Sequence, residues 1–203
     1  MRKIAITGGI ASGKSKLTDF LKSKGEVVID LDEISHTLTD SDEDTINEIT
    51  KIFGDDIKKQ SGSIDRKLLA SIVFSNAEDK KQLEEILLPR IRQVMMNKID
   101  LLEKDNVFVE VQLLAEKNMG SLFDHIIIVS VSKDNQINRL KTIRMMDSNL
   151  INQILTSQLT DQKRKSMLSK YSNNILENDG SEDAFQEKIE SLQKISQSII
   201  FQQ

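Results

Sequence analysis

The residues with the clearest chemistry lie near the N-terminus, in the run ITGGIASGKS of residues 6–15. Gly8, Gly13, Lys14 and Ser15 satisfy the spacing G-x-x-x-x-G-K-[ST], which is typical of loops that hold nucleotide phosphates. Glycines let such a loop turn its N–H groups inward, the lysine reaches the terminal phosphates, and the hydroxyl of the last residue binds Mg²⁺. We therefore expect a nucleoside triphosphate on Gly8, Gly9, Ile10, Ala11, Ser12, Gly13, Lys14, Ser15 and Lys16.

Two carboxylates follow the next apolar run, VVIDLDEIS of residues 27–35. At the end of a strand beside the phosphates, Asp30 or Asp32 could accept the proton of an attacking hydroxyl or orient it. The alternative is structural, because an Asp at this place could instead cap a helix of residues 33–38. The sequence pattern leaves both roles open.

The elements that must position these residues follow from the hydrophobic pattern. Residues 3–7 and 26–30 are predicted strands, and the helical pattern between them ends at Gly25. Further β-branched runs begin at Asn106, His125 and Asn173. Strands that alternate with helices predict an α/β fold with a parallel sheet of about five strands, helices on both faces, and ligands at the carboxyl ends of the strands.

About 75 residues separate the second and third predicted strands, and they are mostly helical in pattern. Helices are expected over residues 42–53, 65–74 and 78–103, the last with a break at Pro89. This insertion is a candidate substrate-holding subdomain. A second helical stretch covers residues 133–170, and the last helix begins near Ser181.

Composition excludes several classes of function. The chain has 203 residues, with 28 Lys and Arg against 32 Asp and Glu, and it therefore has no overall basic field for nucleic acid. Without cysteine there is no disulfide and no thiolate zinc site, whereas a hard cation with oxygen ligands is compatible with the composition. The apolar run after Lys3 is too short for a signal peptide or a membrane span, so we expect a cytoplasmic protein.

Residues 97–100 read NKID and match the N-K-x-D pattern that reads guanine in GTPases. However, Ile91, Met95, Ile99 and Leu102 fall on one helical face around it, which indicates an amphipathic helix instead of a strand and loop. We interpret the match as coincidence.

In its ordered motifs, the chain resembles the dephospho-CoA kinase family. TGGIASGKS is similar to the family's T-G-G-I-G-S-G-K-S and VVIDLD to its V-I-D-A-D. Further along, FGDDI and SIDRKLLASIVFSN, EILLPRI, VEVQLLAE, QINRL and ILENDG resemble family segments in the same order, so the resemblance covers nearly the whole chain.

The resemblance implies the three-layer sandwich fold of P-loop kinases. It also implies an enzyme that transfers phosphate from ATP, with Mg²⁺, to the ribose 3′-hydroxyl of dephospho-CoA. It makes Asp32 the catalytic carboxylate, and it gives Lys14 and Arg139 catalytic roles. Arg139 and Arg144 would belong to a lid, although they could also be solvated arginines. The implied single domain, 1–203, consists of a nucleotide-binding core of residues 1–35, 104–132 and 171–203, an acceptor-binding insertion of residues 36–103, and a lid of residues 133–170.

The resemblance implies roles for further site residues, and for most of them a structural alternative stays open. Glu110 is placed to support Mg²⁺ through water, or it is a strand residue facing a lysine. Glu116 is implied to help position the acceptor or the lid; the alternative is a charged residue at the start of a helix. Asn178 and Gly180 correspond to the region beside adenine, or to an ordinary turn. Segments associated with the acceptor contribute Pro89 and Leu113.

The chain departs from the family pattern at three places that bear on the site. Ala11 replaces a glycine, so we expect a negative φ at residue 11. Leu88 and Gln112 replace a His and a Pro in the acceptor segments. Of the two histidines, His36 could reach substrate but is more typical of a surface residue, and His125 is expected to be structural.

Two other functions stay open at this level: a P-loop kinase for a nucleoside or sugar, and a nucleotide switch of GTPase type. We expect a small-molecule substrate, no nucleic acid or membrane partner, and a monomer or small homo-oligomer.

Overall fold

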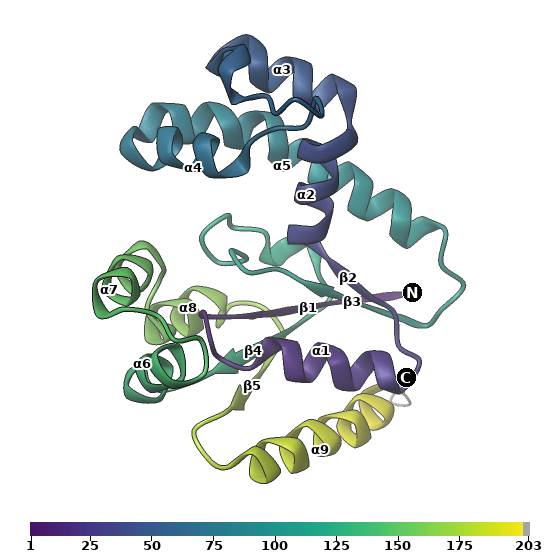
Figure 1. Cartoon of the computed structure of the whole chain (residues 1–203). Coiled ribbons are helices and arrows are strands. Elements are labelled where there is room, and N and C mark those ends of the chain that lie inside the picture. Colours follow the sequence, from purple (N-terminus) through teal and green to yellow (C-terminus); the bar gives the residue numbers. More distant parts are fainter. Residues whose placement is uncertain (201–203) are drawn as a thin grey trace. The chain divides into compact units, whose positions relative to one another are not determined.

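The computed structural model describes residues 1–200 of the chain, and Figure 1 shows its helices and strands. Contacts divide the chain into two compact units, one of Met1–Ile29 with Lys104–Gln203 and one of Asp30–Glu103. None of the helices in residues 1–200 has the length and apolar character needed to cross a lipid bilayer.

The first unit is built on a five-stranded sheet with the strand order β2-β3-β1-β4-β5. The strands are β1 (Arg2–Gly8), β2 (Val28–Asp30), β3 (Asn106–Glu110), β4 (His125–Ser130) and β5 (Asn173–Glu177). β1 pairs in parallel with β3 and β4, and β4 pairs in parallel with β5. The predicted α/β fold with a five-stranded parallel sheet is confirmed.

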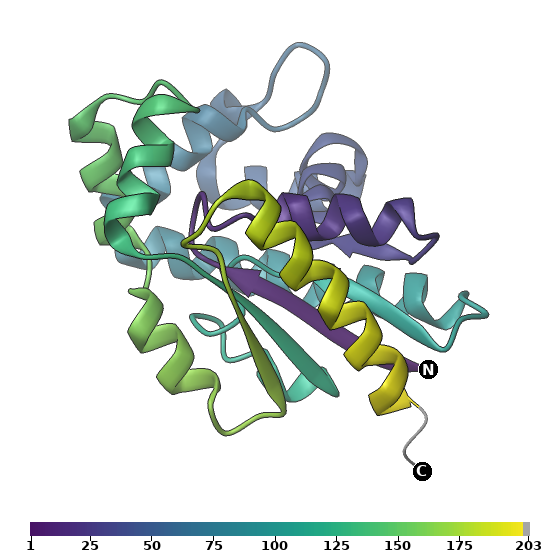
Figure 2. The same ribbon diagram turned by 90° about the horizontal axis from the view of Figure 1, so that it is seen from below.

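Alternation along the strands explains why both faces of the sheet are buried. Ile4 and Ile6 of β1 point to one face, where the helices α1 (Lys14–Ser23) and α9 (Glu182–Ile200) cover them through Leu17 and Phe185 (Figures 1 and 2). Ala5 of β1 points to the opposite face and is fully buried as well. Strands buried on both faces read as continuous apolar runs, which is the pattern the sequence displays.

Three helices connect β4 to β5: α6 (Lys133–Thr142), α7 (Ser148–Ser157) and α8 (Asp161–Leu168). Each begins with a side-chain cap, from Ser132, Asp147 and Thr160 respectively, which satisfies N–H groups that a helix start would leave unpaired. The Ser130 hydroxyl at the end of β4 donates to Asp161 Oδ2 at 2.6 Å, which joins α8 to the sheet. Two short 3₁₀ segments, η1 (Asp55–Ile57) and η2 (Gly120–Leu122), complete the described elements.

The second unit is helical, as the pattern predicts. It contains α2 (Leu31–Ser41), α3 (Glu43–Phe53), α4 (Arg66–Ser75) and α5 (Ala77–Asp100). Its core includes Ile49 of α3, Ile57 and Ile64 of the connection between α3 and α4, and Ile86 of α5. The predicted break at Pro89 is wrong, because α5 runs through the proline as one helix. The buried residues Ile86, Ile91 and Met95 on both sides of Pro89 hold the helix together, and packing outweighs the lost hydrogen bond.

Candidate active site

The phosphate-loop motif forms the connection between β1 and α1, as expected. Gly13 precedes the helix with a φ of 104°, and a Cβ built on it would lie 2.3 Å from Asn178 Nδ2. Only glycine fits at this position, for reasons of both backbone angle and space. The first turn of α1 contains no acidic residue, so the partial positive charge of the helix N-terminus is available to an anion.

Lys14 folds back across its own loop. Its Nζ donates to the carbonyl oxygens of Gly8 at 3.0 Å and Gly9 at 3.1 Å, and the residue is only 8% exposed. The loop therefore keeps a buried cation beside the helix N-terminus, which is the arrangement that attracts phosphate.

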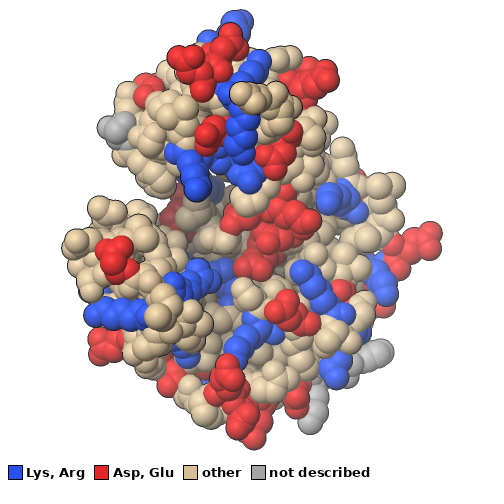
Figure 3. Space-filling model, in the orientation of Figure 1, with Lys and Arg blue, Asp and Glu red and all other residues tan. Residues whose placement is uncertain are grey.

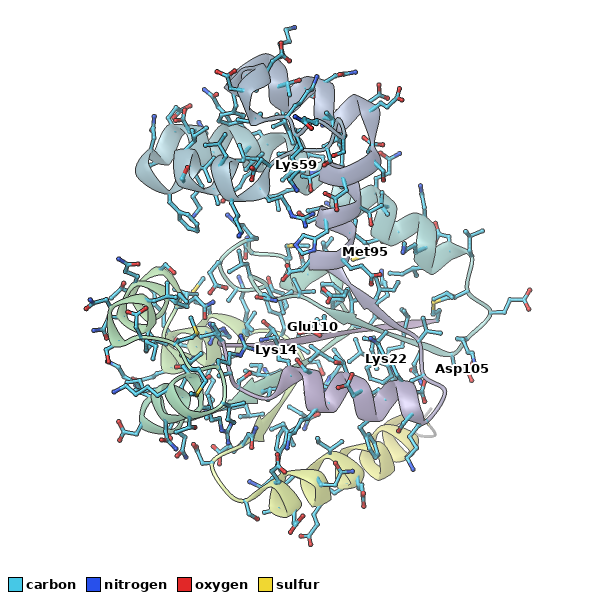
Figure 4. All side chains as sticks on the ribbon, viewed as in Figure 1. Lys14, Lys22, Lys59, Met95, Asp105 and Glu110 are labelled. Carbon is cyan, nitrogen blue, oxygen red and sulfur yellow. The ribbon has the colours of Figure 1, made fainter. Side chains whose placement is uncertain are left out.

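A cavity of about 530 Å³ opens over the loop, within the size range of small-molecule sites. Residues 10–16 line it, whereas Gly8 and Gly9 are not among its lining residues. Figure 4 shows Lys14 at the start of α1 and Glu110 at the end of β3, both of which line the cavity. The structure brings predicted residues from distant parts of the chain to the same cavity, namely Glu110, Arg139, Arg144, Asn178 and Gly180.

Arg139 and Asn178 join the cavity wall to the loop. Arg139 donates to the carbonyl oxygen of Ala11 at 3.3 Å and to that of Asn178 at 2.6 Å. The Asn178 side chain, 5% exposed, donates from Nδ2 to the carbonyl oxygen of Ser12 at 2.7 Å. Arg139 is thus half-buried and fixed by hydrogen bonds, whereas Arg144 is exposed at the cavity mouth.

Charges of both signs surround the cavity. Lys16 forms an ion pair with Glu182, and this hydrogen bond and the lysine charge hold the pKa of Glu182 below its usual value. Over the visible face of the described residues, Figure 3 likewise shows Lys and Arg interspersed with Asp and Glu. The attraction for phosphate is therefore local to the loop and the arginines, and does not come from a broad basic surface.

The expected backbone angle at Ala11 is wrong. Ala11 has a φ of 56°, in the left-handed region that non-glycine residues rarely adopt. For an alanine this conformation costs about 1–2 kcal/mol. The loop keeps its shape with alanine at this position because surrounding groups hold the neighbouring peptides, which include the carbonyl that Arg139 binds.

The two aspartates after β2 take different places. The Asp30 side chain caps α2 and accepts from the N–H of Asp32 at 2.8 Å. Asp32 is exposed in the first turn of α2. The capping alternative thus holds for Asp30. Among the remaining predicted residues, Pro89 is exposed on α5, Leu113 is 40% exposed, and His36 is exposed on α2.

Glu116 belongs to a buried ion pair instead of a helix start. Its Oε1 lies 3.5 Å from Nη2 of Arg164, a residue that is 1% exposed, and it accepts from the N–H of Leu159 at 3.4 Å. Arg164 Nη2 also donates to the carbonyl oxygen of Leu159 at 3.1 Å. Both peptide groups of residue 159, in the connection between α7 and α8, are therefore fixed by this pair.

The sequence pattern missed two glutamines that contact the loop. Gln136 Nε2 donates to the carbonyl oxygen of Ile10 at 2.6 Å, and the N–H of Ile10 donates to Gln158 Oε1 at 3.1 Å. Glutamine carries no charge and no characteristic spacing here, so only the position of Gln136 in QINRL, three residues before Arg139, could have drawn attention to it.

Two further interpretations are confirmed. Residues 97–100, which match the guanine-reading pattern, lie inside α5, where Ile91, Met95 and Ile99 are buried. His125 is structural, because its ring nitrogens lie 2.8 Å from Ser172 Oγ and 2.8 Å from Asn174 Oδ1.

Comparison with known proteins gives consistent matches over most of the chain. A family model described as dephospho-CoA kinase matches residues 2–184. A dephospho-CoA kinase of Blochmanniella pennsylvanica is 35% identical over 195 residues, which cover 94% of this chain and 90% of that protein.

Two solved structures share the fold. A dephospho-CoA kinase from Campylobacter jejuni superposes with a TM-score of 0.72 at 27% identity and covers 97% of this chain and 98% of its own. A protein from Thermus thermophilus gives a TM-score of 0.81 at 26% identity, with 97% and 96% of the two chains covered.

Proposed function

This chain belongs to the dephospho-CoA kinase family, which phosphorylates dephospho-CoA in the last step of coenzyme A biosynthesis, and we propose that it transfers the terminal phosphoryl group of ATP to the ribose 3′-hydroxyl. The observation that carries the proposal is the cavity over the phosphate loop. In it, the α1 N-terminus, buried Lys14 and the arginines Arg139 and Arg144 converge on one space.

In this proposal the loop residues 8–16 hold the triphosphate, and Asn178 and Gly180 lie beside the adenine. Lys14 Nζ exchanges its contacts with the Gly8 and Gly9 carbonyl oxygens for phosphate oxygens when the nucleotide binds. Arg139 and Arg144 neutralise charge that develops on the transferred group. Because the transition state of phosphoryl transfer is loose, positioning and charge stabilisation supply most of the acceleration.

The residues present also fit Mg²⁺. The Ser15 hydroxyl and the Glu110 carboxylate both line the cavity and offer the oxygen ligands that this ion prefers, with Glu110 acting through water. No group of three or more His, Asp or Glu side chains among the described residues is arranged to hold a metal ion. In nucleotide sites Mg²⁺ is usually held by one or two carboxylates together with phosphates and water. Bound there, Mg²⁺ would offset the negative charge of the phosphates.

We assign the acceptor hydroxyl to Asp32. Its neighbour Asp30 is committed to capping α2, so Asp32 is the carboxylate that can orient or deprotonate the 3′-hydroxyl. We further propose that residues 36–103 with Pro89, together with Leu113, contribute to acceptor binding. In the same proposal residues 133–170, positioned in part by Glu116, act as a lid that excludes water. A cytoplasmic location and a monomer or small homo-oligomer stay predictions.

The assignment of Asp32 is tested by Asp32→Asn, which keeps the size of the side chain and removes its charge. We expect transfer to fall by about 100-fold or more while ATP affinity stays within about twofold of the wild type. Turnover should be measured as coenzyme A formed, and ATP binding by titration calorimetry. Lys14→Ala is the matched control and should lose both binding and turnover. Wild-type turnover in Asp32→Asn would remove this residue from the catalytic role.

A further inference from the structure

Side chains from outside the phosphate loop donate hydrogen bonds to the carbonyl oxygens of three consecutive loop residues. Gln136 Nε2 donates to Ile10, Arg139 to Ala11 and Asn178 Nδ2 to Ser12, at 2.6, 3.3 and 2.7 Å. In a planar trans peptide the N–H points opposite to the C=O. These three contacts therefore turn the N–H groups of the following residues away from the supporting side chains.

These hydrogen bonds fix the two peptide groups on either side of Ala11, which define its backbone conformation. Gln136 holds the peptide between residues 10 and 11, and Arg139 holds the one between residues 11 and 12. Gln158 adds a contact one peptide earlier, because its Oε1 accepts from the N–H of Ile10 at 3.1 Å. Ala11 therefore has its left-handed φ of 56° fixed on both sides.

The position of the Gln136 side chain depends on Gly9 of the same loop. A Cβ on Gly9 would lie 2.9 Å from Gln136 Nε2, so a side chain at residue 9 would displace the amide from its present contact with Ile10. Gln158 is positioned from the other side. The buried pair of Glu116 and Arg164 holds both peptide groups of Leu159, the residue that follows Gln158.

From this arrangement we infer that Gln136 and Gln158 are positioning residues for nucleotide binding. Their two hydrogen bonds to Ile10, which we call the clamp, fix the peptides on either side of Ile10 and hold Ala11 in its left-handed conformation. The inference rests on the proposed binding of ATP by this loop. It follows that a loop with alanine at position 11 depends on the clamp, whereas one with glycine there would adopt the same angles without strain.

The two contacts have opposite polarity, and this supplies a charge-matched test. Gln136 acts as donor, so Gln136→Glu loses the bond and places an acceptor against the Ile10 carbonyl oxygen. Gln158 acts as acceptor, so Gln158→Glu keeps its bond to the Ile10 N–H. Both variants add one negative charge beside Ile10. Gln158 also lines the phosphate cavity whereas Gln136 does not, so repulsion of ATP by the new charge acts mainly in Gln158→Glu and opposes the expected difference. We expect the dissociation constant for ATP, measured by calorimetry, to rise about tenfold more in Gln136→Glu than in Gln158→Glu.

The second measurement asks whether the clamp acts through Ala11. In the Ala11→Gly background, the Gln136→Glu penalty on ATP affinity should shrink from about tenfold to less than about threefold. The kcat at saturating ATP should change less than KM in each variant, because the clamp shapes the binding loop and touches no reacting atom. Exposed Gln153→Glu on α7 is the control for added charge, and thermal unfolding verifies that each variant is folded.

Three results would overturn the clamp: equal effects of the two Glu variants, a Gln136→Glu penalty that persists undiminished with glycine at position 11, or tighter ATP binding in Gln158→Leu. The last result would mean that Gln158 competes with phosphate for the Ile10 N–H. Because ATP binding is measured without acceptor, these outcomes are separate from the proposed function. Expected binding with no coenzyme A formed would support the clamp and contradict the proposed transfer.

Discussion

Within the phosphate loop, Ala11 has an energetically unfavourable backbone conformation. Its φ of 56° lies where a Cβ is unfavourable, and the residue is half-buried among groups that hold it there. The same residue illustrates the limit of sequence reasoning. A replacement of glycine suggests that the conformation changes, whereas here the conformation is kept and the neighbours, Gln136 and Arg139, enforce it.

At the residue scale, Ala11→Gly should stabilise the folded protein. Glycine adopts the left-handed region freely, and this gain exceeds the extra chain entropy that glycine brings to the unfolded state. We expect the free energy of unfolding to rise by about 1 kcal/mol, as measured by urea titration. A destabilised Ala11→Gly would mean that residue 11 is not strained.

At the element scale, helix α5 continues through Pro89 although the sequence pattern predicts a break there. Propensity predicts an interruption, but Ile86 and Ile91 are buried on either side of the proline and fix the helix by packing. Such packing belongs to residues that meet only after folding, so a single-sequence pattern does not contain it. The strands, in contrast, could be predicted well, because β1, β3 and β4 are buried on both faces and carry continuous β-branched runs.

Replacement of Pro89 separates the structural cost of the proline from its proposed use. Pro89→Ala restores an N–H donor inside α5 and removes a ring that crowds the preceding turn. We expect the free energy of unfolding to rise by about 1–3 kcal/mol. If Pro89 contributes to acceptor binding, KM for dephospho-CoA should rise in the same variant while KM for ATP is unchanged. An unaltered KM for dephospho-CoA would remove Pro89 from the acceptor site.

Asp179 joins two elements around the cavity and gives a pH-dependent prediction. The N–H of Ser132, at the start of α6, donates to Asp179 Oδ1 at 2.7 Å, and this bond is the largest cause that holds the pKa of Asp179 below its usual value of 3.8. A lowered folded-state pKa contributes stability above the unfolded value, and this stability is lost as the pH falls through the folded pKa.

Asp179→Asn should therefore be less stable than the wild type at pH 6–7, and the difference should disappear as the pH falls through about 4 and below. The measurement is a series of denaturant titrations between pH 3 and 7. A difference that stays constant over this range would show that the charge of Asp179 contributes nothing to the link between α6 and the β5–α9 connection.

At the scale of the whole molecule, the parts of the site that come from one motif are predictable and those that meet through the fold are not. Gly13, Lys14 and Ser15 are fixed by local spacing, and the structure forms the loop as expected. Arg139 and Asn178 could be suggested only by resemblance to a family, since their contact with the loop spans 128 and 166 residues of sequence. Gln136, Gln158 and the Glu116–Arg164 pair carry no pattern that marks them.

Identification by ³¹P NMR of the product that this protein makes from Mg-ATP and dephospho-CoA tests most directly whether it phosphorylates the ribose 3′-hydroxyl. We predict one new phosphomonoester on the ribose 3′-oxygen, formed in equal amount to ADP, and no comparable product with a nucleoside or a sugar as acceptor. Hydrolysis of ATP or GTP that is independent of acceptor, or phosphate found on another hydroxyl, would contradict transfer to the ribose 3′-hydroxyl.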